Sequence, residues 1–362
     1  MSMFKNCLPI LFCLFLFLGC IGKPASEDAA NVPVNIYLNQ DGVVQMKNNS
    51  NSTKFPAKIT NGTKVSITTI DGFSGRPFCM NFDANERMYV CDFDSHKMLK
   101  YGVVTLAPAG EISGRLNKPH SVDFDSSGNL YICNYEGKEI QKYSADGEFL
   151  SAFGSDVLSA PATAYFDFAR EILYVSDYGS NRIARFSKNG NFLGWFEPSG
   201  LSFDRPHVVR EGPGGNLYVV DTWHHRILKI SKSGEFLGWI GAKDDDGTIT
   251  NGWETQGTPS PSSLPGSFNA PTSMDFDANG NFVVSEYGNP RIQLFSKDGK
   301  FIGWFGGTKD GTVTKGWEKE GEAEQGNSPG TFFHPYDVKI HEGKLYVADS
   351  HNNRVQIIEF GD

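Results

Sequence analysis

The sequence predicts an all-β fold, a six-bladed β-propeller that spans residues 64–362. Three observations support this prediction: an apolar motif that occurs six times, glycine-containing turns at a fixed place in each unit, and an extra β run before the first unit. The chain contains 40 Gly and 28 Phe among 362 residues. This composition is typical of many short strands joined by tight turns.

The repeated motif is a short apolar run that ends in an acidic residue or Asn. Its copies are Met88–Asp92, Leu130–Asn134, Leu173–Asp177, Leu217–Asp221, Phe282–Glu286 and Leu345–Asp349. Their second positions, 89, 131, 174, 218, 283 and 346, follow one another at about 40 to 45 residues except across two longer gaps. That period is the signature of a propeller blade.

Each unit contains four expected strands, which we name a, b, c and d in chain order. In the third unit, apolar alternation places them at Ala162–Asp167, Leu173–Asp177, Arg182–Ser187 and Phe192–Phe196. Turns between strands c and d carry Gly, as in Ser187-Lys188-Asn189-Gly190, where a positive φ costs glycine least.

The two ends of the repeat region predict how the ring closes. The last unit ends after its third strand, Val355–Phe360, and the unassigned β run Val65–Ile70 precedes the first unit. We expect this N-terminal strand to complete the last blade, because such closure leaves no open sheet edge.

The segment before the propeller predicts export. Residues 1–20 have a lysine, an apolar run of 11 residues at Leu8–Leu18 and then Gly19-Cys20, which resembles a lipoprotein signal with Cys20 as the lipidated residue. An ordinary cleaved signal peptide and an uncleaved anchor are the alternatives. Residues 21–63 are expected to form a flexible stalk. It carries glycosylation sequons at Asn48, Asn51 and Asn61, which matter only if the host glycosylates exported proteins.

Three cysteines belong to the propeller region. Cys79 and Cys91 stand symmetrically about a turn, which places them opposite each other on paired strands, and Cys133 is the third. Small buried thiols are the favoured interpretation, with a disulfide left open.

A family resemblance rests on an acidic residue followed five positions later by Arg and an aliphatic residue. The pairs are Asp177 with Arg182, Asp221 with Arg226, Glu286 with Arg291, and Asp349 with Arg354. This pattern resembles the core of NHL repeats and covers nearly all of 64–362, although the first two units depart from it. The resemblance implies the six-bladed fold, and the pairs are expected to be hairpin ion pairs.

Strand order places the b–c turns and the d–a connections on one face of the ring. Seven of the eight histidines map there, namely His96, His120, His207, His224, His225, His334 and His351, and His341 maps to the opposite face. A Pro-x motif begins strand a, so His120, His207 and Tyr336 are expected to converge on the axis.

This set of residues is similar to the Pro-His motifs with which peptidyl-amidoglycolate lyases hold zinc. Tyr336 replaces the third histidine, with His334 two residues before it. Zinc normally takes at least three protein ligands, so a metal-free polar mouth is favoured over a metal held by His120 and His207.

Two insertions, 242–269 and 307–333, share the sequence pattern of Asp246–Glu254 and Asp310–Glu318. Trp253 and Trp317 in these inserts either stack on a sugar or peptide or pin each insert to its blade, and pinning is favoured. Trp223, in the Trp223-His224-His225 turn, breaks the repeat and is the better candidate for ligand contact. Asp244–Asp246 suggests calcium, but its spacing is not that of a calcium loop.

Charge excludes one class of function and favours others. A net charge of −9 argues against nucleic acid, which requires clustered Lys and Arg. Both inserts are acidic, which predicts a cationic, metal or neutral partner. We expect a monomeric, surface-anchored binding module for a protein, peptide or glycan, without assigned catalytic residues or cofactor.

Two alternatives remain for the function. One is a lyase or lactonase-like enzyme at the channel mouth, with zinc or calcium as its metal. The other is a structural scaffold whose inserts hold a partner, in which case removal of 243–268 is expected to leave the fold intact.

Overall fold

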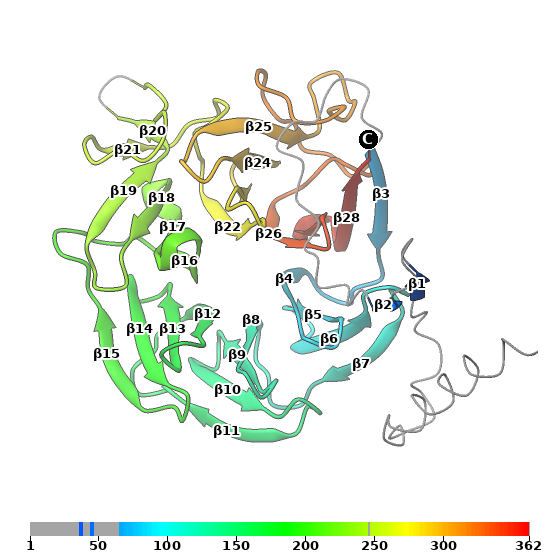
Figure 1. Ribbon diagram of the computed structural model, residues 1–362, viewed down its shortest axis with the longest axis vertical. Helices are drawn as coiled ribbons and strands as arrows, with labels where there is room; N and C mark the ends of the chain where they lie inside the picture. Colours follow the sequence, from blue (N-terminus) through cyan, green and yellow to red (C-terminus); the bar gives the residue numbers. More distant parts are fainter. Residues whose placement is uncertain (1–35, 39–43, 47–64, 245–246, 362) are drawn as a thin grey trace, which may run out of the picture. The chain divides into compact units, whose positions relative to one another are not determined.

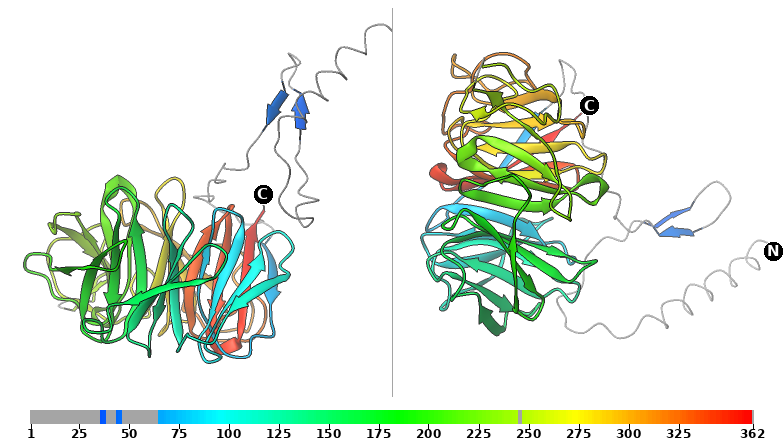
Figure 2. Two further views of the ribbon diagram at one scale, coloured as in Figure 1. Left: turned by 90° about the horizontal axis from the view of Figure 1, so that it is seen from below. Right: turned by 90° about the vertical axis from the view of Figure 1, so that its left-hand side faces the viewer.

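The computed structural model describes residues 36–38, 44–46, 65–244 and 247–361. Within residues 65–361, six four-stranded antiparallel sheets surround a central axis (Figure 1), which confirms the predicted six-bladed propeller. Figure 2 shows that the strands run between two faces that carry the turns. Strand a of each blade lies innermost, so residues at the start of strand a border the channel.

The blades follow one another along the chain. Blade 1 contains β4 (Pro77–Phe82), β5 (Arg87–Asp92), β6 (Lys97–Gly102) and β7 (Pro108–Ile112). Blade 2 contains β8 (Pro119–Phe124), β9 (Leu130–Asn134), β10 (Glu139–Tyr143) and β11 (Phe149–Phe153). Blade 3 contains β12 (Pro161–Asp167), β13 (Ile172–Asp177), β14 (Arg182–Ser187) and β15 (Phe192–Phe196).

The second half of the ring repeats this arrangement. Blade 4 contains β16 (Pro206–Glu211), β17 (Leu217–Asp221), β18 (Arg226–Ile230) and β19 (Phe236–Ile240). Blade 5 contains β22 (Pro271–Phe276), β23 (Phe282–Glu286), β24 (Arg291–Phe295) and β25 (Phe301–Gly306). Blade 6 contains β26 (Pro335–His341), β27 (Lys344–Asp349), β28 (Arg354–Phe360) and β3 (Val65–Ile70). Short 3-10 turns lie at η2 (Pro213–Gly215), η3 (Thr222–His224) and η4 (Ser350–Asn352).

The ring closes as predicted. Strand β3 pairs antiparallel with β28, from Val355 opposite Ile70 to Phe360 opposite Val65 (Figure 1). The first strand of the propeller therefore completes the last blade, and this pairing removes the edge that β28 would otherwise expose.

A β-bulge follows the first proline of every blade. The pairing of strands a and b shifts by one residue immediately after Pro77, Pro119, Pro161, Pro206, Pro271 and Pro335. The extra residue has no partner on strand b, and bulges of this kind redirect a side chain. In these blades the extra residues include Phe78, His120, His207 and Tyr336, which contact one another at the axis.

The acidic residue at the end of strand b accepts a hydrogen bond from the backbone of the d–a connection that precedes strand a of the same blade. Asp221 Oδ1 accepts the backbone N–H of Asp204 at 2.7 Å, and Glu286 accepts that of Asn269 at 2.9 Å. Equivalent bonds join Asp177 to Ser159, Asp349 to Phe333, and Asn134 to Asn117. These contacts fix the backbone just before each strand a.

The next residue along the connection is held by the preceding blade. The N–H of Ala270 donates to His225 Nδ1 at 3.0 Å, that of Arg205 to Asn181 Oδ1 at 2.8 Å, and that of Lys118 to His96 Nδ1 at 3.0 Å. All three donors have a positive φ near 50°. A left-handed backbone before proline is costly, so these side-chain acceptors stabilise it.

The acidic residues also form most of the expected ion pairs. Arg226 binds Asp221 at 2.8 Å, Arg291 binds Glu286 at 2.7 Å, and Arg354 binds Asp349 at 2.8 Å. Arg182 instead lies over the Trp195 ring, with no ion pair to any residue that the structure describes.

The first insert contains a two-stranded sheet of its own, in which β20 (Ala242–Lys243) pairs with β21 (Pro259–Ser260). Isolated bridges join Glu254 to Trp239 of blade 4 and Glu318 to Trp304 of blade 5. The Trp253 ring stacks on Phe282, and its Nε1–H donates to the carbonyl of Lys297 at 3.2 Å. The Trp317 ring stacks on Phe360. Both rings therefore pin their inserts.

From the structure we expect removal of 243–268 to destabilise the fold, in contrast to the scaffold expectation. Phe268 is fully buried in the blade core, and the guanidinium of Arg291 donates to the carbonyls of Ser263, Leu264 and Ser267. Deletion would take away these partners and leave a buried charge poorly solvated.

The expectation of free thiols is wrong for one pair. Cys79 and Cys91 are register partners on β4 and β5, with their Cα atoms 5.2 Å apart, and they form a disulfide. This separation lies within the range that a disulfide spans without backbone movement. Cys133 is buried and free.

The segment before the propeller contains β1 (Ile36–Leu38) and β2 (Val44–Met46), which pair antiparallel. The expected signal segment, Cys20 and the sequons at Asn48, Asn51 and Asn61 lie outside the described residues. In the part of the chain that the structure covers, no helix has the length and apolarity needed to cross a membrane.

The interblade role of His225 leads to a stability prediction. We expect His225→Ala to lower the free energy of unfolding by about 1–2 kcal/mol, because the Ala270 N–H loses its acceptor and Ala disfavours the left-handed backbone at this position. His225→Asn should restore most of this loss, since Asn181 and Asn353 occupy the same place in other blades. Urea unfolding measures both variants, and equal losses would contradict the assignment.

Candidate functional site

The centre of the candidate site is a cluster of four side chains from four different blades. The ring centroids of His120 and His207 are 4.9 Å apart, and Tyr336 lies 5.0 Å from His207 and 5.7 Å from His120. Phe78 packs against Tyr336 with the ring centroids 4.0 Å apart. The structure therefore brings together His120, His207 and Tyr336, which the sequence placed at the axis.

Both central histidines are buried and incompletely hydrogen-bonded. His120 is 3% and His207 4% exposed. Nδ1 of His120 and both ring nitrogens of His207 have no partner among the described residues. Burial lowers the pKa of His120 to about 4 and that of His207 well below its usual value, and the nearby His120 lowers the latter further. The imidazoles are therefore neutral near pH 7 and offer nitrogen donors and acceptors to a ligand.

A pocket of about 380 Å³ lies on the face that carries the b–c turns, and we call it the aromatic bowl. The residues of its wall that matter most are Arg76, Tyr178, His207, Trp223, Tyr287 and Tyr336. Its volume lies within the range for small-ligand sites. A second cavity of about 210 Å³ shares His207 and Tyr336 and continues along the channel past Asp123 and Arg210.

The rim of the bowl is aromatic and partly open to solvent. Trp223 is 46% and Tyr287 37% exposed. Trp223 Nε1–H donates to the Tyr178 hydroxyl at 3.0 Å, and the Arg205 guanidinium lies over both rings, at 5.6 Å from Tyr178 and 5.1 Å from Trp223. Trp223, the tryptophan that the sequence favoured for ligand contact, thus lines the bowl.

Two other candidate histidines support the walls. His224 Nδ1 lies 2.8 Å from Asp221 Oδ2, in the place where Asn352 contacts Asp349 at 2.8 Å. His334 stacks on Tyr287 at 4.0 Å, and its Nδ1 lies 2.6 Å from the Tyr287 carbonyl oxygen. With His225 in the interblade contact, these three histidines position the site, while Trp253 and Trp317 pack against blades 5 and 6.

The sequence interpretation missed Tyr178, Tyr287, Arg76 and Arg205. A signal for the tyrosines was present, because an aromatic residue directly follows the end of strand b in four blades, as Phe93, Tyr135, Tyr178 and Tyr287. The two arginines share a place in their blades, since each directly precedes the first proline of strand a. Arg76 pairs with Asp94 at 2.6 Å, and its guanidinium lies over Phe78.

The expected negative charge is not found in the bowl. Of the described residues that line it, none is a carboxylate, and Arg76 is charged. Two acidic residues of the inserts form ion pairs, Glu254 with Lys243 and Glu322 with Lys309. The bowl itself therefore does not carry the negative charge that the acidic inserts led us to expect.

The central cluster does not fit the zinc site that the lyase resemblance implies. His120 and His207 supply two imidazoles, and burial raises the pKa of the Tyr336 phenol, which keeps it protonated. No third histidine or carboxylate joins these two among the described residues. A zinc ion normally requires three protein ligands, and two imidazoles fall short of that number.

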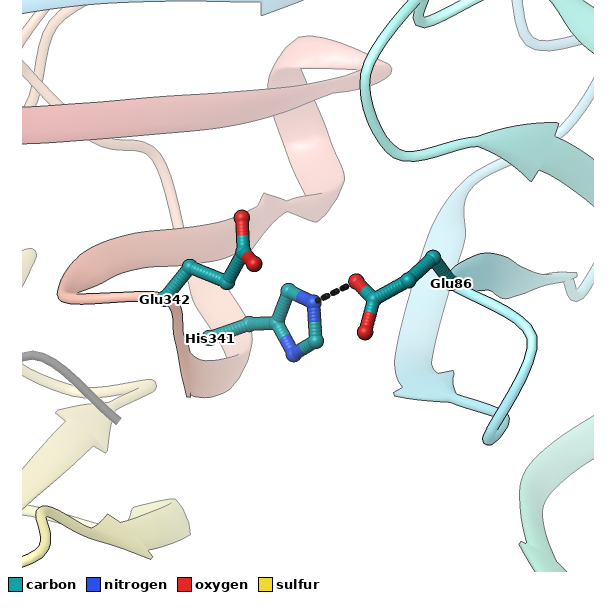
Figure 3. A group of neighbouring side chains, drawn as sticks. All are labelled: Glu86, His341 and Glu342. Atoms are coloured by element: carbon teal, nitrogen blue, oxygen red, sulfur yellow. Dashed lines mark hydrogen bonds and ion pairs between the residues drawn. The ribbon is translucent and has the colours of Figure 1, made fainter. Parts of the chain in front are cut away.

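The opposite face carries a different group of polar side chains (Figure 3). Glu86, His341 and Glu342 each place one ligand atom within 4.8 Å of the others. His341 Nε2 lies 2.8 Å from Glu86 Oε2, and its ring stacks on Phe82. His341, which the sequence placed alone on this face, thus joins blades 6 and 1 by a side-chain contact.

Comparison with solved structures finds propellers of low sequence identity. An auxiliary nutrient binding protein from Bacteroides thetaiotaomicron has a TM-score of 0.57 and 15% identity, covering 90% of this chain and 82% of its own. Another such protein, from Bacteroides ovatus, has a TM-score of 0.58 and 14% identity, and the match covers 86% of this chain and 76% of that protein. A streptogramin B lyase has a TM-score of 0.52 and 12% identity, and the match covers 82% of this chain and 98% of the lyase. No protein-family model and no curated protein matches the sequence.

The neutral central histidines predict a pH-dependent stability. Because their pKa values are lower in the folded than in the unfolded protein, the unfolded state takes up protons first and stability falls as the pH drops from about 6.5 toward 4. For His120 the loss should be about 2 kcal/mol between about pH 7.5 and about pH 5, and His207 should lower the stability in the same direction.

The double variant His120→Gln, His207→Gln should therefore lose less stability on acidification than the wild type. Urea unfolding at both pH values measures the difference, with His341→Gln as a control on the opposite face. An unchanged pH dependence in the double variant would show that these imidazoles take up protons as readily in the folded as in the unfolded protein, and would contradict the lowered pKa values.

Proposed function

We propose that the protein is an exported binding protein whose propeller holds a small ligand, a glycan or a peptide segment, in the aromatic bowl. One observation carries the proposal: partly exposed aromatic rings surround the neutral imidazole of His207, whose two ring nitrogens lack partners among the described residues. His120 packs against His207 from the inner cavity. Aromatic faces provide stacking area, and buried polar groups without partners are costly unless a ligand or water satisfies them.

The neighbours with solved structures support this proposal at the level of the fold. Two of them are named as nutrient binding proteins, and both have low identity to this chain. The N-terminal segment supports export, with Cys20 as the lipid-anchored residue at the cell surface. We further propose that the chain is a monomer of NHL type.

The binding proposal predicts that Trp223 contributes directly to ligand contact. Trp223→Ala should weaken or abolish binding of those glycans or peptides that an array identifies for the wild type, because it removes a stacking face worth about 1–3 kcal/mol by analogy with other aromatic platforms. Leu264→Ala, which alters an exposed residue of the first insert, is the matched control.

The same pair of variants tests the scaffold alternative. A partner held by the inserts would be lost in Leu264→Ala and retained in Trp223→Ala. That result would overturn binding in the bowl.

A second candidate function is a lyase or lactonase-like enzyme at the channel mouth. It is supported by the position of His207, whose neutral imidazole borders both the bowl and the inner cavity, where a general base would meet a substrate. Tyr336 would act as the proton donor opposite it.

Elemental analysis of protein purified without chelator separates a metal-dependent enzyme from a binding protein. We expect no stoichiometric zinc or calcium, because two imidazoles and a protonated phenol form a poor ligand set. Stoichiometric metal that is lost in the His120→Ala, His207→Ala double variant would favour the enzyme and overturn this expectation.

A further inference from the structure

We propose that the ligand of the aromatic bowl is a small cyclic carboxylate and that Arg205 binds its carboxylate group. This inference rests on the proposed function, because it requires the bowl to be the binding site. It goes further because it assigns a negative charge to the ligand. The net charge of the chain, −9, does not by itself suggest a negatively charged ligand.

Arg205 lies beside the bowl, over two of the rings that line it, and has no counterion among the described residues. Its guanidinium is stacked over Tyr178 and Trp223, and it forms no ion pair or side-chain hydrogen bond with any residue that the structure describes. No ion pair joins the guanidinium to the carboxylate of the neighbouring Asp204 among the described residues, and the backbone N–H of Asp204 donates to Asp221. The ring contacts occupy guanidinium faces and leave the N–H edge free, and this edge matches the two oxygens of a carboxylate.

The backbone holds Arg205 in place for such a contact. Its N–H donates to Asn181 Oδ1 at 2.8 Å, its φ is 50°, and Pro206 follows it. His207 is the next residue and projects into the floor of the bowl. One rigid tripeptide therefore presents a cation at the rim and a neutral imidazole at the base.

The spacing of these groups suits a ring that carries an acid group on its edge. A ligand ring would rest against Trp223 or Tyr287, with its carboxylate at Arg205 and its remaining polar atoms directed toward the nitrogens of His207. Uronic acid sugars and aryl carboxylic acids share this chemistry.

The other charged groups at the bowl do not oppose an anion. Arg76 adds a second guanidinium, which is paired with Asp94, and Lys118 is paired with Glu136. No carboxylate lines the bowl among the described residues, so its lining presents no negative charge to repel an acid.

Isothermal titration with matched acid and neutral probes tests the inference. The probes are glucuronic acid with its methyl ester, and phenylacetate with phenylacetamide. We expect at least one acid to bind roughly tenfold more tightly than its neutral counterpart, because a charge-assisted hydrogen bond to Arg is lost in the neutral probe. The pair that shows the preference distinguishes a sugar from an aromatic source.

Two arginine variants make the test specific. Arg205→Gln should reduce the affinity for the acid roughly to that for the neutral probe. Arg182→Gln is the control, because Arg182 also lies over a tryptophan without an ion pair but stands on the outer part of blade 3. A preference for acids that survives Arg205→Gln would overturn the assignment of Arg205.

The remaining outcomes separate this inference from the proposed function. Equal affinity for acid and neutral probes, lost in Trp223→Ala, would overturn the carboxylate inference and leave the bowl as the binding site. Absence of binding by all four probes would also overturn the inference, while the array experiment with Trp223→Ala would still decide the proposed function.

Discussion

The buried acidic residue at the end of strand b is the interaction on which the rest of the propeller depends. Asp221, Glu286 and Asp349 each accept a backbone N–H from the connection before their own blade and bind an arginine of strand c. A carboxylate buried in this way would be unfavourable without such partners. Its hydrogen bonds therefore fix the course of the backbone between two blades. The connections that contain the long inserts enter the next blade in the same way.

That path determines the geometry of the site. The next residue of the connection is left-handed and is held by the preceding blade, as Ala270 is by His225. Proline follows, and the bulge after it brings one side chain per blade to the channel. Blades 2, 4 and 6 use this position for His120, His207 and Tyr336. The repeated scaffold thus fixes a place on the axis, and the identity of the residue there differs from blade to blade.

The chemistry of the bowl differs from that of the whole chain. The protein is acidic overall, but no carboxylate lines the bowl among the described residues, and its wall includes aromatic rings, neutral imidazoles and a guanidinium. Burial keeps His120 and His207 neutral, so they act as hydrogen-bonding groups and not as cations. A binding function follows from this local environment more directly than from the likeness to other propellers, which concerns the fold.

The sequence by itself determined the blades, the closing strand Val65–Ile70 and the convergence of His120, His207 and Tyr336, because these follow from a repeat whose period and polarity are local properties of the chain. Only the tertiary structure decided which polar residues face the bowl. His224 and His225 position the wall of the bowl through their contacts with Asp221 and Ala270. Tyr178, Tyr287 and Arg205 lie at its rim. The physical reason is that a turn residue acts according to its contacts with the neighbouring blade, and those contacts join residues that are far apart in the sequence.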